Sequence, residues 1–106
     1  MKLLDLINLF KTDIVFEDFL KDNSLNLNSE CIEIYMKDKI HPNSELAFFE
    51  IENTNDKIVF EKNSVKYYSL FDFYFFIDCM SEAKDDKTLS SEKLVKILIN
   101  YSINDA

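Results

Sequence analysis

The sequence predicts an α+β domain in which an antiparallel sheet of about four strands, connected as a meander, carries two N-terminal and two C-terminal helices. Three observations predict this class. Apolar residues recur at helical spacing near both ends of the chain, they alternate with polar residues between 31 and 68, and short runs rich in Asn, Asp and Ser separate the alternating segments. A length of 106 residues fits one domain spanning residues 1–106.

Two short helices are expected at the start of the chain. Residues 2–11 place four apolar side chains at i, i+3, i+4 and i+7, which is one helical face: Leu3, Leu6, Ile7 and Phe10. Thr12-Asp13 resembles a break followed by a new cap. Residues 14–21 then form the second helix, with Phe16, Phe19 and Leu20 turned inward.

The alternating segments predict four strands. Residues 31–37 place Ile32, Ile34 and Met36 on one face and Glu33, Tyr35 and Lys37 on the other. Residues 45–52 place Ala47, Phe49 and Ile51 on one face and Leu46, Phe48, Glu50 and Glu52 on the other. A tight turn at 53–56 leads to a third strand at 57–62. Asn63-Ser64 is a two-residue hairpin turn before a fourth strand at 65–68.

The stretch from Ser69 to Met80, SLFDFYFFIDCM, is the most aromatic in the chain. Its alternation permits a strand, but Ser69 and Asp72 resemble a capping box and no turn signal follows before Lys84, which favours a helix. A helix here has a core face of Leu70, Phe73, Tyr74, Phe76, Ile77 and Met80. Its second face combines Phe71, Phe75 and Cys79 with Asp72, Asp78 and Glu82, and is either buried or open to a partner.

A final helix is expected to start at Ser90. Leu89 and Leu94 have the spacing of a hydrophobic staple around this cap. The buried stripe is predicted to comprise Leu94, Ile97, Leu98 and Tyr101. Residues 102–106 are expected to fray.

The composition argues against an enzyme. Without Gly, the chain cannot form a glycine-rich phosphate loop. One His and two distant Cys cannot form a zinc site, and Asp85-Asp86 lacks the spacing of a calcium loop. We therefore expect no catalytic residue, no metal, no cofactor and no small-molecule substrate. His41 is expected to be an exposed loop residue.

The formal net charge of −8 predicts repulsion from nucleic acid and anionic membranes and attraction to basic proteins. All twelve cationic residues are Lys, so no Arg is present to clamp phosphates. The first ten residues are too short and too interrupted by Asp5 for a signal peptide, which predicts a cytoplasmic protein. Cys31 and Cys79 are expected to be free thiols in buried positions.

Two surfaces are candidates for binding a basic protein partner. The first is an acidic outer sheet face comprising Glu33, Glu50, Glu52 and Glu61 with Phe48. The alternative for this face is ordinary solvation. The second is the helix face comprising Phe71, Phe75, Asp78 and Glu82, for which the alternative is burial beneath the N-terminal helices.

In its small size, acidity, single domain and lack of a catalytic motif, the chain resembles the cytosolic immunity proteins of contact-dependent growth inhibition and colicin-like toxin systems. This resemblance implies a non-enzymatic inhibitor that binds a basic toxin domain, a nuclease for example, and blocks its active site. Two other functions stay open. One is a phage-type acidic inhibitor of a nucleic-acid-binding defence protein, and the other is a non-catalytic subunit of a larger protein assembly.

Overall fold

The computed structural model describes residues 1–12, 14, 16–25, 31–54, 57–86 and 88–104. Within them lie helices α1 (Leu3–Lys11), α2 (Phe16–Asp22), α3 (Ile51–Thr54), α4 (Phe73–Lys84) and α5 (Ser91–Asn104), and strands β1 (Ile32–Lys37), β2 (Leu46–Glu50), β3 (Val59–Lys62) and β4 (Val65–Asp72). The predicted α+β class is confirmed. The first two residues of the turn expected at 53–56 belong to α3, and the other two lie outside the described residues. Asp13, part of the expected second cap, also lies outside them.

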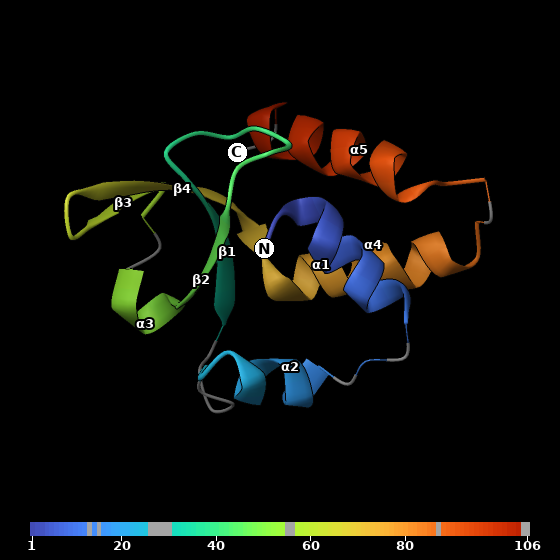
Figure 1. The fold of residues 1–106 in the computed structure, drawn as a ribbon, viewed down its shortest axis with the longest axis horizontal. Coiled ribbons are helices and arrows are strands. Elements are labelled where there is room, and N and C mark those ends of the chain that lie inside the picture. The colour runs from blue at the N-terminus through green and yellow to red at the C-terminus, as the bar shows by residue number, and fades with distance from the viewer. Residues whose placement is uncertain (13, 15, 26–30, 55–56, 87, 105–106) are drawn as a thin grey trace.

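The four strands form one antiparallel sheet in the order β2-β1-β4-β3. Strands β1 and β2 form one hairpin and β3 and β4 form the other, and the two hairpins pair through β1 and β4. This order differs from the predicted meander, in which each strand pairs with the next one in sequence. Asn63 and Ser64 both have positive φ, 53° and 66°, as the predicted two-residue hairpin turn requires. The link from β2 to β3 joins opposite edges of the sheet, and α3 lies on it, away from α1, α4 and α5 (Figure 1).

The main core lies between one face of the sheet and the helices α1, α2, α4 and α5. The predicted faces of α1 and β1 are confirmed, since Leu3, Leu6, Ile7, Phe10, Ile32, Ile34 and Met36 are all buried. Phe73 is the centre of this core. Its ring centroid lies 5.0–5.8 Å from those of Phe10, Phe16, Phe19, Phe48 and Phe76.

The prediction that a helix starts at Ser69 is wrong. Strand β4 continues to Asp72, and Ser69 pairs with Tyr35 of β1 while its N–H donates to the Ile58 carbonyl at 2.8 Å. Asp72 is the actual cap of α4, because its carboxylate accepts a hydrogen bond from the Phe75 N–H at 2.8 Å. Pairing with β1 on one side and with Ile58, directly before β3, on the other holds Ser69 in the sheet, so a local capping pattern does not decide where the helix begins.

Two residues of the predicted helix core face differ from the prediction: Leu70 is buried but lies on β4, and Tyr74 lies on α4 but is exposed. Tyr74 is 52% exposed, whereas Phe73, Phe76 and Met80 are buried and Ile77 is partly buried. Tyr74 follows Phe73 by one residue, so it is rotated by about 100° to the border of the buried stripe. Its phenol ring can therefore face water.

The buried stripe of α5 also differs from the prediction. Ile97 is 47% exposed and Tyr101 is 39% exposed. The buried residues are instead Ser91, Leu94, Val95, Leu98 and Ser102. The two serines permit close packing, and their hydroxyls donate to the Asn8 side-chain oxygen at 2.5 Å and the Ile99 carbonyl at 2.8 Å. The helix continues to Asn104, so fraying from residue 102 is not observed.

The position of the α4 cap can be tested by substitution. Asp72→Ala removes the acceptor of the Phe75 N–H and is expected to lower the free energy of unfolding by about 1 kcal/mol. Asp72→Asn, which keeps a capping oxygen, should retain most of that stability. Ser69→Ala is the matched control, and urea denaturation measures all three. A larger loss for Ser69→Ala than for Asp72→Ala would place the cap at Ser69.

Candidate protein-binding surface

The outer face of the sheet, opposite the main core, carries an aromatic cluster of Tyr35, Phe49, Phe60 and Tyr67. The Phe49 ring centroid lies 5.1 Å from those of Phe60 and Tyr67 and 5.5 Å from that of Tyr35. The Tyr35 hydroxyl donates to the Lys57 carbonyl at 2.5 Å, which ties the cluster to the link between β2 and β3. This face is therefore a second packed layer.

The prediction that one sheet face gathers the acidic residues is wrong. Glu33 lies on the outer face but is only 4% exposed. Glu50 and Phe48 pair with Ile32 and Ile34, which places them on the helix side of the sheet.

Aromatic packing explains this arrangement of β2. The Phe48 ring lies 5.3 Å from Phe19 and 5.8 Å from Phe73, so burying it in the main core fixes which face of β2 points inward. Glu52 is exposed within α3 and not on a strand, and Glu61 is exposed on β3. The structure therefore does not bring the four glutamates together.

The second predicted surface is partly open. Phe71 is buried on β4, and its ring lies 5.3 Å from that of Phe75, which is half-buried on α4. Phe75 stacks on Tyr101 of α5 with ring centroids 4.3 Å apart and an angle of 17° between the planes. Asp78 and Glu82 are exposed. We call the exposed side chains of Asp78, Glu82, Ile97 and Tyr101, with the rim of Phe75, the α4–α5 surface.

A groove of about 280 Å³ lies within this surface. It is lined by Cys79, Glu82, Ala83, Asp86, Leu89, Leu94, Ile97 and Leu98, and we call it the α4–α5 groove. Asp86 accepts hydrogen bonds from the Thr88 hydroxyl at 2.6 Å and the Thr88 N–H at 2.9 Å, which lower the pKa of its carboxyl. Burial, followed by the negative charges of Glu82 and Asp78, raises the pKa of the Cys79 thiol.

The raised pKa of Cys79 leads to a test of the local electrostatic potential. Glu82→Gln removes one of the charges that disfavour the thiolate, so the pH profile of Cys79 alkylation by iodoacetamide should move to lower pH. Part of the elevation should remain, because burial is its largest cause. Glu61→Gln, on β3, is the matched control and should leave the profile unchanged. An identical profile for both variants would mean that Glu82 does not act on the thiol.

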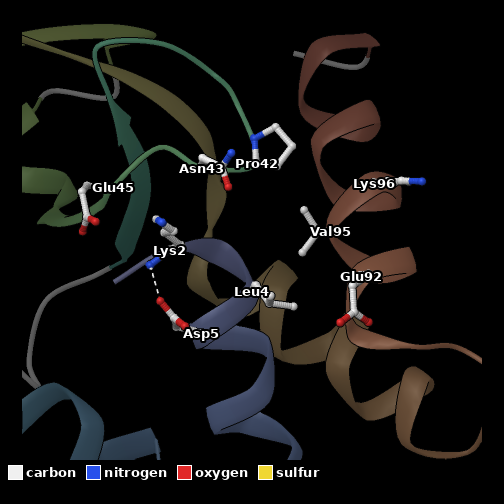
Figure 2. Close-up of a pocket in the computed structure, with 9 residues that line it drawn as sticks. All are labelled: Lys2, Leu4, Asp5, Pro42, Asn43, Glu45, Glu92, Val95 and Lys96. Carbon is white, nitrogen blue, oxygen red and sulfur yellow. Dashed lines mark hydrogen bonds between the residues drawn. The ribbon is translucent and has the colours of Figure 1, made fainter.

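A larger pocket, of about 630 Å³, lies between the start of α1, the β1–β2 loop and α5 (Figure 2). It is lined by Lys2, Leu4, Asp5, Pro42, Asn43, Glu45, Glu92, Val95 and Lys96. Leu4 and Val95 point toward one another across it, and the Lys2 N–H donates to Asp5 at 2.9 Å (Figure 2). Glu45 forms an ion pair with the amino group of Met1. The pocket lining therefore carries charges of both signs.

The remaining features predicted from the sequence concern metal binding, His41, the cysteines and the membrane. No group of three or more His, Cys, Asp or Glu side chains in it could hold a metal ion. His41 is exposed, as predicted, and its Nδ1 accepts a hydrogen bond from the Asn43 N–H at 3.0 Å. Cys79 is a free thiol as predicted, and both cysteines are half-buried rather than fully buried. None of the described helices is long and apolar enough to cross a membrane.

Comparisons with protein-family models, with curated proteins and with solved structures found no match to this chain.

Proposed function

We propose that this protein is a non-catalytic inhibitor of the immunity type, which binds a basic toxin domain in the cytoplasm and neutralises it, with a nuclease as the expected toxin. The observation that carries the proposal is the α4–α5 surface, where exposed carboxylates lie beside exposed apolar side chains. Among the residues whose side chains the structure describes, which leave out position 84, Asp78 and Glu82 have no cationic partner within ion-pair distance. Their charges are therefore available to a basic protein.

The two kinds of side chain serve different steps of binding. Exposed carboxylates in a chain with a net charge of −8 accelerate the encounter with a basic partner. Exposed apolar side chains such as Ile97 and Tyr101 lose contact with water in the complex, which slows dissociation. An inhibitor that must capture a toxin quickly and hold it benefits from both.

A second candidate function, a subunit of a larger assembly, is favoured by the β3 edge. Strand β3 is at the end of the sheet, and Ile58, directly before it, is 68% exposed. An edge strand beside exposed apolar side chains can pair with another chain. Light scattering on the purified protein separates the two functions, since an inhibitor is expected to remain monomeric whereas a subunit should self-associate or precipitate.

Co-expression tests the proposed function directly. The partner to be tested is a basic toxin domain, which this proposal expects the neighbouring gene to encode. Cells that express this domain should stop growing, and co-expression of the wild-type chain should restore growth. An unrelated acidic protein of similar size is the control for nonspecific charge effects. If the domain kills cells at full strength in the presence of this chain, the proposal is wrong.

A further inference from the structure

We propose that the α4–α5 groove receives a positively charged segment of the partner, which inserts an aliphatic or aromatic side chain between α4 and α5 and sets Lys or Arg side chains against Glu82 and Asp78. This inference rests on the proposed function and identifies the surface through which it operates.

The groove is shaped for a protein side chain. Six of its lining residues are apolar or weakly polar: Cys79, Ala83, Leu89, Leu94, Ile97 and Leu98. Its volume of about 280 Å³ is close to the lower end of the range of roughly 300–1,000 Å³ for small-molecule pockets, so the apolar lining and the charged rim indicate the occupant, and the size does not. Leu94 and Leu98 are buried and form the floor, whereas Ile97 is exposed at the rim.

The groove continues along α5 as an exposed apolar strip. Ile97 and Tyr101 are one helical turn apart, so their side chains are neighbours on the same side of the helix. Tyr101 is held in place by its stacking on Phe75, which gives the strip a fixed aromatic end. A rigid aromatic next to an aliphatic groove is typical of the anchor positions of protein interfaces.

The charge of the rim selects a cationic segment. Glu82 lines the groove, and Asp78 lies one turn of α4 before Glu82. Asp86, which also lines the groove, is oriented by its hydrogen bonds from Thr88, so it adds a third carboxylate to the rim. Among the residues whose side chains the structure describes, which leave out position 84, no lysine lines the groove. After burial, which is the largest cause, Glu82 and Asp78 also raise the pKa of the Cys79 thiol in the groove.

The same charge argues against a second copy of this chain as the occupant. Two copies joined symmetrically through this groove would bring Glu82 and Asp78 of both chains together, and like charges at an interface oppose binding. A basic segment has the opposite charge at the same positions. Charge complementarity therefore favours a basic partner over self-association.

Three synthetic peptides test the inference on the purified full-length protein by fluorescence anisotropy. Each has about 18 residues, long enough to form a helix. One combines Lys and Leu on opposite helical faces, one combines Lys and Ser, and one combines Glu and Leu. We expect the Lys–Leu peptide to bind at least about tenfold more tightly than either of the others, because it alone supplies both charge and an apolar anchor.

Two variants with the same change in net charge locate the binding site. Glu82→Lys should weaken binding of the Lys–Leu peptide about tenfold or more, whereas Glu61→Lys, on β3, should change it by less than about twofold. Both side chains are exposed, and circular dichroism confirms that each variant folds.

Several results would overturn the inference. These are no binding of the Lys–Leu peptide, equal binding of the Lys–Ser peptide, or equal weakening by Glu82→Lys and Glu61→Lys. Co-expression distinguishes this failure from failure of the proposed function. If both the wild type and Glu82→Lys neutralise the toxin fully, the function stands and the groove is not its site. If the wild type does not neutralise the toxin, the function itself fails.

Discussion

Phe73→Ala is expected to lower the free energy of unfolding by about 3–5 kcal/mol, the usual cost of removing a buried Phe. Phe73 is fully buried where α4 meets the sheet, and it packs against five other phenylalanines from α1, α2, β2 and α4. Removing the ring leaves a cavity that several elements must close together. Because small domains are stable by only about 5–15 kcal/mol, the loss should be obvious in urea or thermal denaturation.

Tyr74→Ala is the matched control for this prediction. Tyr74 is the next residue on α4 and half of its side chain is exposed, so its truncation should cost less than about 1 kcal/mol. Phe73→Leu, which keeps most of the apolar volume, should lie between the two. Equal losses for Phe73→Ala and Tyr74→Ala would contradict the position of Phe73 at the centre of the main core.

Ile97→Ala is expected to weaken binding of the basic partner, and of the Lys–Leu peptide, by about 10- to 30-fold, the loss typical of an interface anchor. The substitution leaves the net charge unchanged and removes the largest exposed apolar side chain at the rim of the α4–α5 groove. The loss should arise mainly from faster dissociation, because encounter rates depend on charge. Stopped-flow or surface-binding kinetics measure both rates.

Ile103→Ala provides the control on the same helix. Ile103 is 60% exposed but lies outside the lining of the groove, so its truncation should leave affinity within about twofold of the wild type. If Ile97→Ala and Ile103→Ala weaken binding equally, or if neither changes the affinity, the partner does not anchor in the groove.

The local elements could be predicted because their signals lie within single segments. The spacing of Leu3, Leu6, Ile7 and Phe10 determines the buried face of α1, and the alternation from Ile32 to Met36 determines that of β1. The turn at Asn63-Ser64 follows from residues that tolerate positive φ in a chain without glycine. These features need no knowledge of distant residues.

The remaining features of the fold depend on contacts between segments that are far apart in sequence. Ser69 joins a strand because β1 and the residues before β3 pair with it, which its own neighbours do not indicate. Phe48 points inward because Phe19 and Phe73 receive it. Nothing within residues 45–52 shows which of the two alternating faces meets the helices.

The candidate site is half predictable from the sequence. The sequence offers Asp78 and Glu82, with Phe75, as a face that is either buried or open, and both carboxylates are exposed in the structure. The helical spacing of Ile97 and Tyr101 predicts that they are buried, but both are exposed. The buried positions of α5 instead include Ser91 and Ser102, whose small side chains fit closely against neighbouring elements. Helical spacing alone cannot separate an apolar residue in the core from one at a binding surface.

Alkylation of the two cysteines tests the central claim most directly. Iodoacetamide modification of Cys79 and Cys31 can be followed by mass spectrometry in the wild-type chain, alone and in complex with the basic toxin domain. Cys79 lines the α4–α5 groove, whereas Cys31 directly precedes β1 and is an internal control. We expect the complex to slow modification of Cys79 by about tenfold or more while that of Cys31 is unchanged. A stable complex that leaves Cys79 as reactive as in the isolated protein would contradict binding at this groove.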